Sequence, residues 1–189
     1  ISGECNMWLE MFIISRDFLK KIVFEAASRN QSSFTREILQ GRKDEYKIMG
    51  YEHKGIFTRI DSVQSYYNAN QMLLETEKRN ALFVKNMPIY TKIGDNGPVK
   101  YGLDSSIKNS LIADGCVIEG TVENSILFRG VKVGKGTVVK NCVLLQGTKV
   151  GSNCSISYVI TDKNVEVSND KVLTGSETYP LYIGKEGKI

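Results

Sequence analysis

A six-residue repeat of aliphatic side chains dominates the second half of the chain and restricts its fold more than any other feature. Between positions 127 and 145 an aliphatic residue returns at every sixth position, with small and polar residues in between. The positions that follow this spacing are Ile112, Ile118, Leu127, Val133, Val139 and Leu145, and Val150 and Ile156 resume it after a slip of one. A period of six matches neither the 3.6-residue turn of an α-helix nor the alternation of a β-strand.

Three short straight segments in each turn of a triangular coil explain this spacing. Each segment points one aliphatic side chain into the prism, and the turns stack through backbone hydrogen bonds about 4.8 Å apart. The corners require small residues or unusual dihedral angles, and glycines suit them at Gly115, Gly120, Gly130, Gly134, Gly136, Gly147 and Gly151. This hexapeptide pattern is typical of a parallel β-helix. Parallel crossovers are right-handed in about 98% of cases, but proteins with this repeat resemble the left-handed family, so we expect a single-stranded left-handed parallel β-helix.

A longer repeat sets the number of turns. The segments SLIADGCVIEG, SILFRGVKVGKG, CVLLQGTKVGSN and YVITDKNVEV align with one another when each is counted from its first residue, at Ser110, Ser125, Cys142 and Tyr158. Residues 101–167 should therefore form about four turns, with open edges that favour pairing with another chain or with the first domain. Residues 168–189 are either a closing strand or a tail, so the β-helix domain is placed at 101–189.

Residues 1–85 follow a different pattern. MWLEMFII at 7–14 predicts a strand, and the SRDFLKKIVFEAA segment predicts a helix with Ser15 as its N-cap. SSFTREIL predicts a short helix, and the segment 46–60 predicts a hairpin that turns at 52–55. Asp61 is expected to cap a further helix that runs to about Leu74.

This set of elements indicates the end of a larger α/β domain. Too few strands are present to cover the helices, so residues 1–85 are expected to be the C-terminal part of an α/β domain. Residues 86–100 contain two of the three prolines and a GDNG turn, and they predict the linker. Because the chain opens at Ile1 rather than at Met, we expect it to be an excised domain or fragment.

Composition excludes several classes of function. The chain has 25 basic and 21 acidic residues and a net charge of +4, with no long run of one sign, so neither a nucleic acid nor a membrane is expected as partner. No apolar stretch approaches the ~20 residues of a membrane span, and no leader pattern is present, which favours the cytoplasm. The cysteines are Cys5, Cys116, Cys142 and Cys154, and they form no metal-binding or redox motif.

The single histidine argues against an acyltransferase. Hexapeptide acyltransferases use a catalytic histidine that projects from the coil as a base. Here the only histidine is His53, which lies in the predicted hairpin turn, and the coil has none. We expect His53 to be a solvated turn residue.

The succession of an α/β ending, a helix that begins DSVQSYYNANQMLL, a PIYT linker and a hexapeptide coil resembles the ADP-glucose pyrophosphorylase (glucose-1-phosphate adenylyltransferase) family. The segments YEHKGIFTRIDSVQSYYNAN, KNMPIYT and NSLIADGCVIEGTVENSILFRGVKVGKG carry the resemblance, which covers nearly the whole chain. Members join glucose-1-phosphate and ATP into ADP-glucose and pyrophosphate, with magnesium held by carboxylates.

The resemblance implies that residues 1–85 are the C-terminal part of a nucleotidyltransferase-like domain, and it places the glycine-rich nucleotide loop and the glucose-phosphate lysine upstream of this chain. The chain alone is therefore not expected to be a working enzyme, and it is assigned no catalytic, cofactor-binding or metal-binding residue. Magnesium is expected only in the full catalytic assembly.

One functional position of the family falls inside the chain. Catalytic members carry a segment like W-R-D-V-G-T-L, whose Asp helps to hold the metal, and the aligned segment here is FTRIDSV at 57–63. Arg59 then stands where a metal carboxylate is expected, and a guanidinium cannot bind magnesium. Replacement by Asp61 is one alternative, but the two positions lie ~6.6 Å apart on a strand, and helix capping is the simpler role for Asp61. A locally shifted alignment, with Arg59 as an ordinary surface residue, is the remaining alternative.

These observations predict a non-catalytic or regulatory subunit of glucose-1-phosphate adenylyltransferase in glycogen biosynthesis. By this resemblance the coil serves subunit assembly and allosteric coupling, either with a catalytic homologous subunit or by self-association. A sugar-phosphate effector is a candidate ligand for Lys132, Lys135 and Lys140, although evenly spread lysines usually serve solubility. The alternatives are an active nucleotidyltransferase in the full-length form and a purely structural β-helix assembly module.

Overall fold

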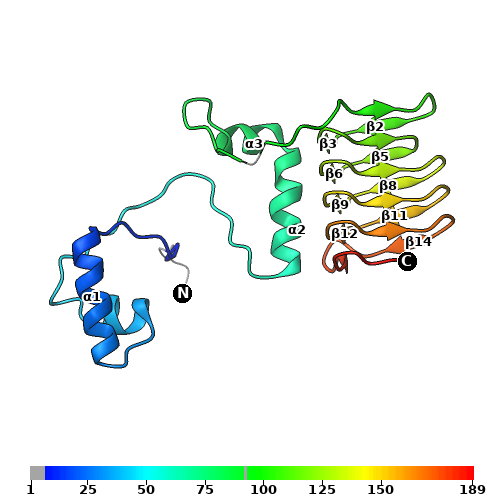
Figure 1. Ribbon diagram of the computed structural model, residues 1–189. Helices are drawn as coiled ribbons and strands as arrows, with labels where there is room; N and C mark the ends of the chain where they lie inside the picture. The colour runs from blue at the N-terminus through cyan, green and yellow to red at the C-terminus, as the bar shows by residue number, and fades with distance from the viewer. Residues whose placement is uncertain (1–6, 92) are drawn as a thin grey trace, which may run out of the picture. The chain divides into compact units, whose positions relative to one another are not determined.

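The computed structural model describes residues 7–91 and 93–189, and the chain divides into two compact units between His53 and Lys54. Within its described residues the first unit holds two helical segments. The second unit holds three helical segments followed by a stack of short strands (Figure 1). The domain limits predicted near residues 85 and 100 stay predictions.

The first unit is built around one helix pair. The helix predicted behind Ser15 forms as α1 (Arg16–Ser28), and Ser15 takes the extended N-cap conformation without a side-chain capping bond. The segment η1 (Phe34–Gln40) lies where the sequence predicts a short helix, but it has the wider turn of a π-helix. Ile22 of α1 and Ile38 of η1 are buried together in a small core.

The strand predicted at 7–14 and the hairpin predicted at 46–60 are both wrong. Between residues 7 and 62 the structure contains no strand. A strand needs a neighbour that takes up its backbone hydrogen bonds, and among the described residues neither segment meets one. Large apolar side chains of these segments consequently stay exposed, among them Met7, Ile13, Met49 and Tyr51.

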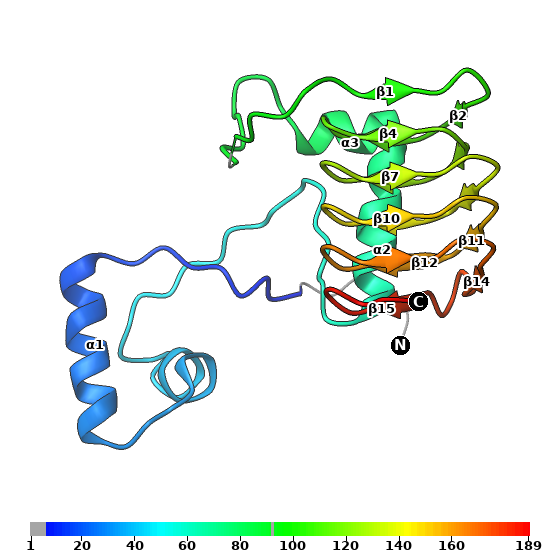
Figure 2. The ribbon, with the colours of Figure 1, turned by 45° about the vertical axis from the view of Figure 1, so that its right-hand side comes forward.

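The second unit contains the parallel β-helix that the hexapeptide spacing predicts. Fifteen strands form three parallel sheets of five strands each, with orders β1-β4-β7-β10-β13, β2-β5-β8-β11-β14 and β3-β6-β9-β12-β15. Each turn of the chain thus adds one strand to each sheet (Figure 2). The strands of the first three turns are β1 (Lys100–Tyr101), β2 (Ser106–Lys108), β3 (Leu111–Ile112), β4 (Val117–Ile118), β5 (Thr121–Glu123), β6 (Ile126–Leu127), β7 (Lys132–Val133), β8 (Val138–Lys140) and β9 (Val143–Leu144). Those of the last two turns are β10 (Lys149–Val150), β11 (Ser155–Ser157), β12 (Val159–Thr161), β13 (Glu166–Val167), β14 (Val172–Thr174) and β15 (Leu181–Ile183).

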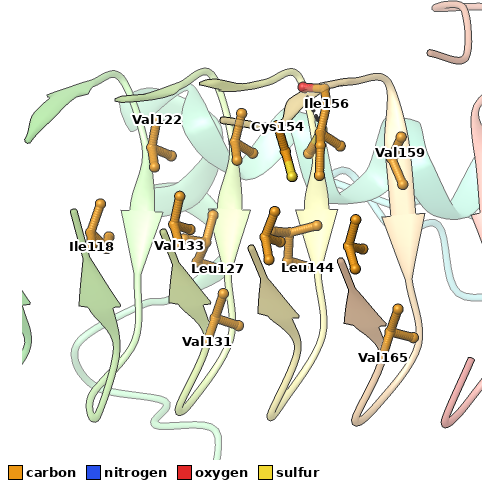
Figure 3. Packing of buried hydrophobic residues seen from close by; sticks show 14 of the residues in the cluster. Ile118, Val122, Leu127, Val131, Val133, Leu144, Cys154, Ile156, Val159 and Val165 are labelled. Carbon is orange, nitrogen blue, oxygen red and sulfur yellow. Dashed lines mark hydrogen bonds between the residues drawn. The ribbon is translucent and has the colours of Figure 1, made fainter. Parts of the chain in front are cut away.

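The core is a set of stacked aliphatic columns inside the prism. In register, Ile118 lies beside Val133 in one sheet and Leu127 lies beside Leu144 in another. All four are at most 1% exposed, and Figure 3 shows them with the neighbouring turns. Burying such a side chain contributes about 1.5–3 kcal/mol relative to leaving it in water. The aliphatic residues that form the sequence repeat are therefore also the residues whose burial stabilises the β-helix.

Two details of the predicted repeat are wrong. Leu144, not Leu145, points inward after Val139, because Leu144 pairs with Leu127 and Leu145 lies one residue further, at the corner. The YVIT segment is aligned one residue out of register, since Ile160 rather than Val159 pairs with Val143. The step from Val139 to Leu144 is five residues instead of six, and the YVIT segment follows the preceding turn by 17 residues instead of 16.

The segment 168–189 continues the stack, so the closing-strand alternative is confirmed and the tail is not. Strand β14 pairs with β11, and β15 pairs with β12. Beyond them, Lys188 forms a parallel bridge with Glu166 of β13. A fifth turn is thereby completed, one more than the four expected from residues 101–167.

A helix covers one outer face of the prism. Helix α2 (Val63–Gln71) runs along the stack of turns and is followed by η2 (Met72–Leu74) and α3 (Thr76–Leu82), as Figures 1 and 2 show. Tyr67 of α2 packs on the outward residues Val143 and Ile160, which are at most 1% exposed. The third sheet is therefore apolar on both faces, and α2 keeps its outer face from water.

Candidate functional site

The segment of Arg59 and Asp61, for which the sequence predicts a degenerate metal position, lies directly before α2. Arg59 Nε lies 3.8 Å from Asp61 Oδ2, and the two side chains are 53% and 63% exposed. The Asp61 carboxylate thus faces a guanidinium, which is the arrangement of a surface ion pair.

Asp61 does not cap the helix, so that expectation is wrong. The N-cap is Ser62, whose Oγ accepts from the Ser65 backbone N–H at 3.0 Å. Ser65 Oγ in turn accepts from the backbone N–H of Ser62 at 2.9 Å. The two hydrogen bonds between Ser62 and Ser65 satisfy two backbone N–H groups at the N-terminus of α2. The single side chain of Asp61 does not provide both.

The residues of this segment do not fit a magnesium ion. Magnesium is held by carboxylates with near-octahedral oxygen geometry, whereas Asp61 offers one carboxylate beside a positive charge. Across residues 7–91 and 93–189, no group of three or more His, Cys, Asp or Glu side chains is placed to hold a metal. No metal-dependent step is therefore assigned to this chain.

Helix α2 connects this segment to the β-helix through polar and apolar contacts. The Tyr67 hydroxyl donates to the backbone oxygen of Asn141 at 3.0 Å, and Tyr67 is 3% exposed. Burial raises the pKa of Tyr67 far above its ordinary value, so the hydroxyl stays a donor. Near the start of the helix, Gln64 Nε2 donates to the backbone oxygen of Glu177 at 2.8 Å. The helix is thus fixed to the third turn and to the last turn.

The GDNG turn of the predicted linker is fixed to the first turns of the β-helix. Asn96 Nδ2 donates to Asp114 Oδ2 at 2.7 Å, and Arg129 Nε lies 3.3 Å from Asp114 Oδ1. The hydrogen bond from Asn96, together with the charge of Arg129, lowers the pKa of Asp114. The backbone N–H of Gly115 also donates to the oxygen of Gly97 at 2.7 Å.

The structure does not gather the three lysines considered for a sugar-phosphate effector. Lys132 lies on β7 and Lys140 ends β8, in a different sheet, while Lys135 lies in the corner between them. Lys140 Nζ pairs with Glu123 at 3.1 Å. These positions are spread around the prism, and an effector site that uses all three stays a prediction.

The first and last turns present apolar side chains at their open strand edges. Leu103 and Tyr101 on the first turn are 106% and 57% exposed. Val172 and Tyr182 on the last turn are 73% and 50% exposed. Unpaired edges with apolar neighbours favour association with another strand.

The remaining candidate groups are not arranged for chemistry. His53 is exposed and lies outside the β-helix. Cys116, Cys142 and Cys154 are buried free thiols, and burial raises the pKa of the Cys142 thiol to about 12. Cys5 lies outside the described residues. Among the residues that the structure describes, no helix is long and apolar enough to cross a membrane.

Comparison with known proteins agrees with this architecture. Residues 99–178 match a family model described as GlmU-like, C-terminal hexapeptide. The chain is 41% identical over 177 residues to the glycogen biosynthesis protein GlgD of Bacillus subtilis (strain 168), which covers 94% of this chain and 51% of that protein.

Further relatives are named either glycogen biosynthesis protein GlgD or glucose-1-phosphate adenylyltransferase. The GlgD of Geobacillus stearothermophilus is 38% identical over 116 residues, which is 49% of this chain and 34% of that protein. A glucose-1-phosphate adenylyltransferase of Fusobacterium nucleatum is 33% identical over 132 residues, which is 68% of this chain and 34% of that protein. The chain spans about half the length of the first of these relatives and about a third of the other two.

Proposed function

Because the chain belongs to the ADP-glucose pyrophosphorylase family and has GlgD proteins among its relatives, we propose that it is part of a regulatory, non-catalytic subunit of glucose-1-phosphate adenylyltransferase that serves glycogen biosynthesis. In this proposal the full-length protein binds a catalytic homologue in the cytoplasm and changes its activity. Magnesium belongs to the catalytic partner.

The pairing of Arg59 with Asp61 carries the proposal. A nucleotidyl transfer that depends on magnesium needs carboxylates free to hold the ion. Here the carboxylate that follows the aligned position is 3.8 Å from a guanidinium. Positive charge at this place repels a cation, which supports a subunit that does not carry out the transfer itself.

The contacts of α2 support a role in coupling. The helix begins immediately after Arg59 and Asp61, and its Tyr67 is bonded to the third turn of the β-helix. A displacement of the β-helix ends on binding a partner would therefore reach the Arg59 segment through one short helix that buries Tyr67 and Asn70. The exposed apolar residues of the first and last turns support an assembly role for the β-helix.

The proposal is tested with the full-length protein that carries this sequence. ADP-glucose formation is assayed with magnesium in the absence of any partner, and negligible turnover is expected. Light scattering after size-exclusion chromatography then follows the protein mixed with a catalytic homologue, and a mixed complex is expected. Robust turnover alone contradicts the proposal in favour of an active nucleotidyltransferase. Self-association without a mixed complex contradicts it in favour of a structural assembly module.

A further inference from the structure

A groove of about 400 Å³ lies between the α2 region and one corner of the β-helix. It is lined on the helical side by Asn68, Gln71 and Glu75, and on the β-helix side by Tyr158. All of these residues belong to the second compact unit. The groove is separate from the Arg59 segment, which lies before the start of α2.

The side chain of Gln71 has an unused donor in this groove. Its Nε2 atom is buried and has no hydrogen-bond partner among the described residues. Buried amide donors are almost always paired, and an exception indicates a missing partner such as a ligand group or a water molecule. Because Gln71 lines the groove, a ligand bound there lies next to this side chain.

Tyr158 occupies a corner where the other turns use asparagine. The sheet register places Tyr158 at the position held by Asn109, Asn124 and Asn141 in the three preceding turns. All four have positive φ, between 43° and 54°. Asparagine adopts this left-handed conformation readily, but a bulky aromatic residue is strained there. Strain of this kind is commonly retained where a side chain serves binding.

The ring of Tyr158 is half-buried and lines the groove beside Tyr67. The two ring centroids are 6.5 Å apart and the rings are tilted by 52°. An aromatic ring on the wall of a polar groove provides a flat apolar surface with polar groups around it.

The charges of the lining disfavour an anionic ligand. Lys78 Nζ pairs with Glu75 Oε1 at 2.8 Å, and the exposed Glu177 adds a second carboxylate without a second cation. A phosphate would therefore meet an excess of negative charge. The Oδ1 of Asn68 already accepts from Gln64 Nε2 at 2.8 Å, which leaves its amide N–H groups as donors.

Amide donors, carboxylate acceptors and an aromatic ring together match a neutral ring that carries hydroxyl groups. We propose that this groove binds a neutral pyranose sugar, with the C–H face of the sugar on Tyr158 and a hydroxyl oxygen accepting from Gln71 Nε2. The proposal goes beyond the regulatory function and does not depend on it, because it concerns a separate ligand and site.

The test is saturation-transfer NMR with the full chain, titrated with D-glucose, D-galactose and maltotriose, and with glucose-1-phosphate as the charged comparator. At least one neutral sugar is expected to bind more tightly than glucose-1-phosphate. The variants Tyr158→Asn and Gln71→Met are each expected to weaken that binding by about tenfold or more. Gln146→Met makes the same chemical change at an exposed corner outside the groove, and binding should be unchanged.

The variants also separate binding from folding. Tyr158→Asn places at this corner the residue that three other turns already use, so the variant is expected to keep the native circular dichroism spectrum. Sugar binding that is lost while the spectrum is retained supports the proposal. Absence of neutral-sugar binding to the parent chain overturns it, as does preferential binding of glucose-1-phosphate. Binding that is unaffected by both groove variants overturns it as well, because the sugar then binds elsewhere.

Discussion

The hydroxyl of Tyr67 donates a hydrogen bond to the backbone oxygen of Asn141 over 3.0 Å and so connects helix α2 to the third turn of the β-helix. The two residues are 74 positions apart in the sequence. Around this bond the ring of Tyr67 packs on Val143 and Ile160, so the contact is both polar and apolar.

Removal of the Tyr67 hydroxyl tests this connection. Tyr67→Phe keeps the ring and leaves the Asn141 oxygen of this part-buried bond without its donor, so the free energy of unfolding should fall by about 0.5–1.5 kcal/mol. Urea denaturation followed by circular dichroism measures the change. Tyr101→Phe is the matched control, because Tyr101 is 57% exposed, and it should change stability by less than about 0.5 kcal/mol. Equal effects of the two variants would contradict a specific role for the Tyr67 bond.

The start of α2 offers a direct test of its cap. Ser62→Ala removes the side chain that accepts from Ser65, and it should lower the free energy of unfolding by about 1 kcal/mol. Asp61→Ala should cost less than about 0.5 kcal/mol, since Asp61 is an exposed ion-pair partner. Urea denaturation of the two variants distinguishes the residues. A larger loss for Asp61→Ala would place the cap at Asp61 instead.

Two adjacent leucines test the register of the coil. Leu144 is fully buried inside the prism, so Leu144→Ala should cost about 2–5 kcal/mol through lost burial and the cavity left behind. Leu145 lies at the corner and is only partly buried, so Leu145→Ala should cost less than about 1.5 kcal/mol. Thermal and urea unfolding measure both. The reverse order would mean that the strict six-residue spacing, rather than the register seen here, defines the core.

The buried thiol of Cys142 predicts a loss of stability at high pH. Its pKa is about 12 in the folded chain, against about 8.5 for an exposed thiol. The unfolded chain therefore loses this proton first, and stability is full below pH 8.5 and falls as the pH rises towards 12. Urea midpoints measured from pH 8 to pH 11 should decline more steeply for the parent chain than for Cys142→Ala. Identical slopes would show that the thiol of Cys142 is not protected by burial.

The β-helix could be predicted because its signal is local and repeated. Each inward residue contacts its equivalent one turn away, as Ile118 contacts Val133, so the same side-chain requirement returns in every turn. The corners are less regular, which is why the predicted positions of Leu145 and the YVIT segment are out by one residue. A count with a fixed period does not reveal such changes in spacing.

Other parts of the structure depend on contacts that sequence patterns do not reveal. The apolar run at 7–14 has strand-forming residues, but a strand also requires a partner, and no segment that the structure describes pairs with it. The sequence does contain one signal for the docking of α2, which was overlooked. Pairs of consecutive apolar residues, such as Ile126 with Leu127 and Val143 with Leu144, show that the third sheet is apolar on its outer face and needs a cover.

The candidate site was predicted in part. Arg59 and Asp61 lie close together as a pair, but Asp61 proved to be an ion-pair partner and not the cap. Asp and Ser are both favourable cap residues, and Ser65 decides between them because it returns a hydrogen bond to Ser62. The groove at Gln71 and Tyr158 was not predicted, because it joins residues that are distant in the sequence.

The most direct measurement of the central claim is the rate of ADP-glucose formation by the catalytic homologue as increasing amounts of the full-length protein are added. A regulatory subunit should change the maximal rate or the apparent affinity for glucose-1-phosphate, and the change should saturate when the two proteins are present in a fixed ratio. The full-length protein alone serves as the control and should add negligible turnover. Rates that are unchanged at every ratio, or that increase only by turnover of the added protein itself, would contradict the account.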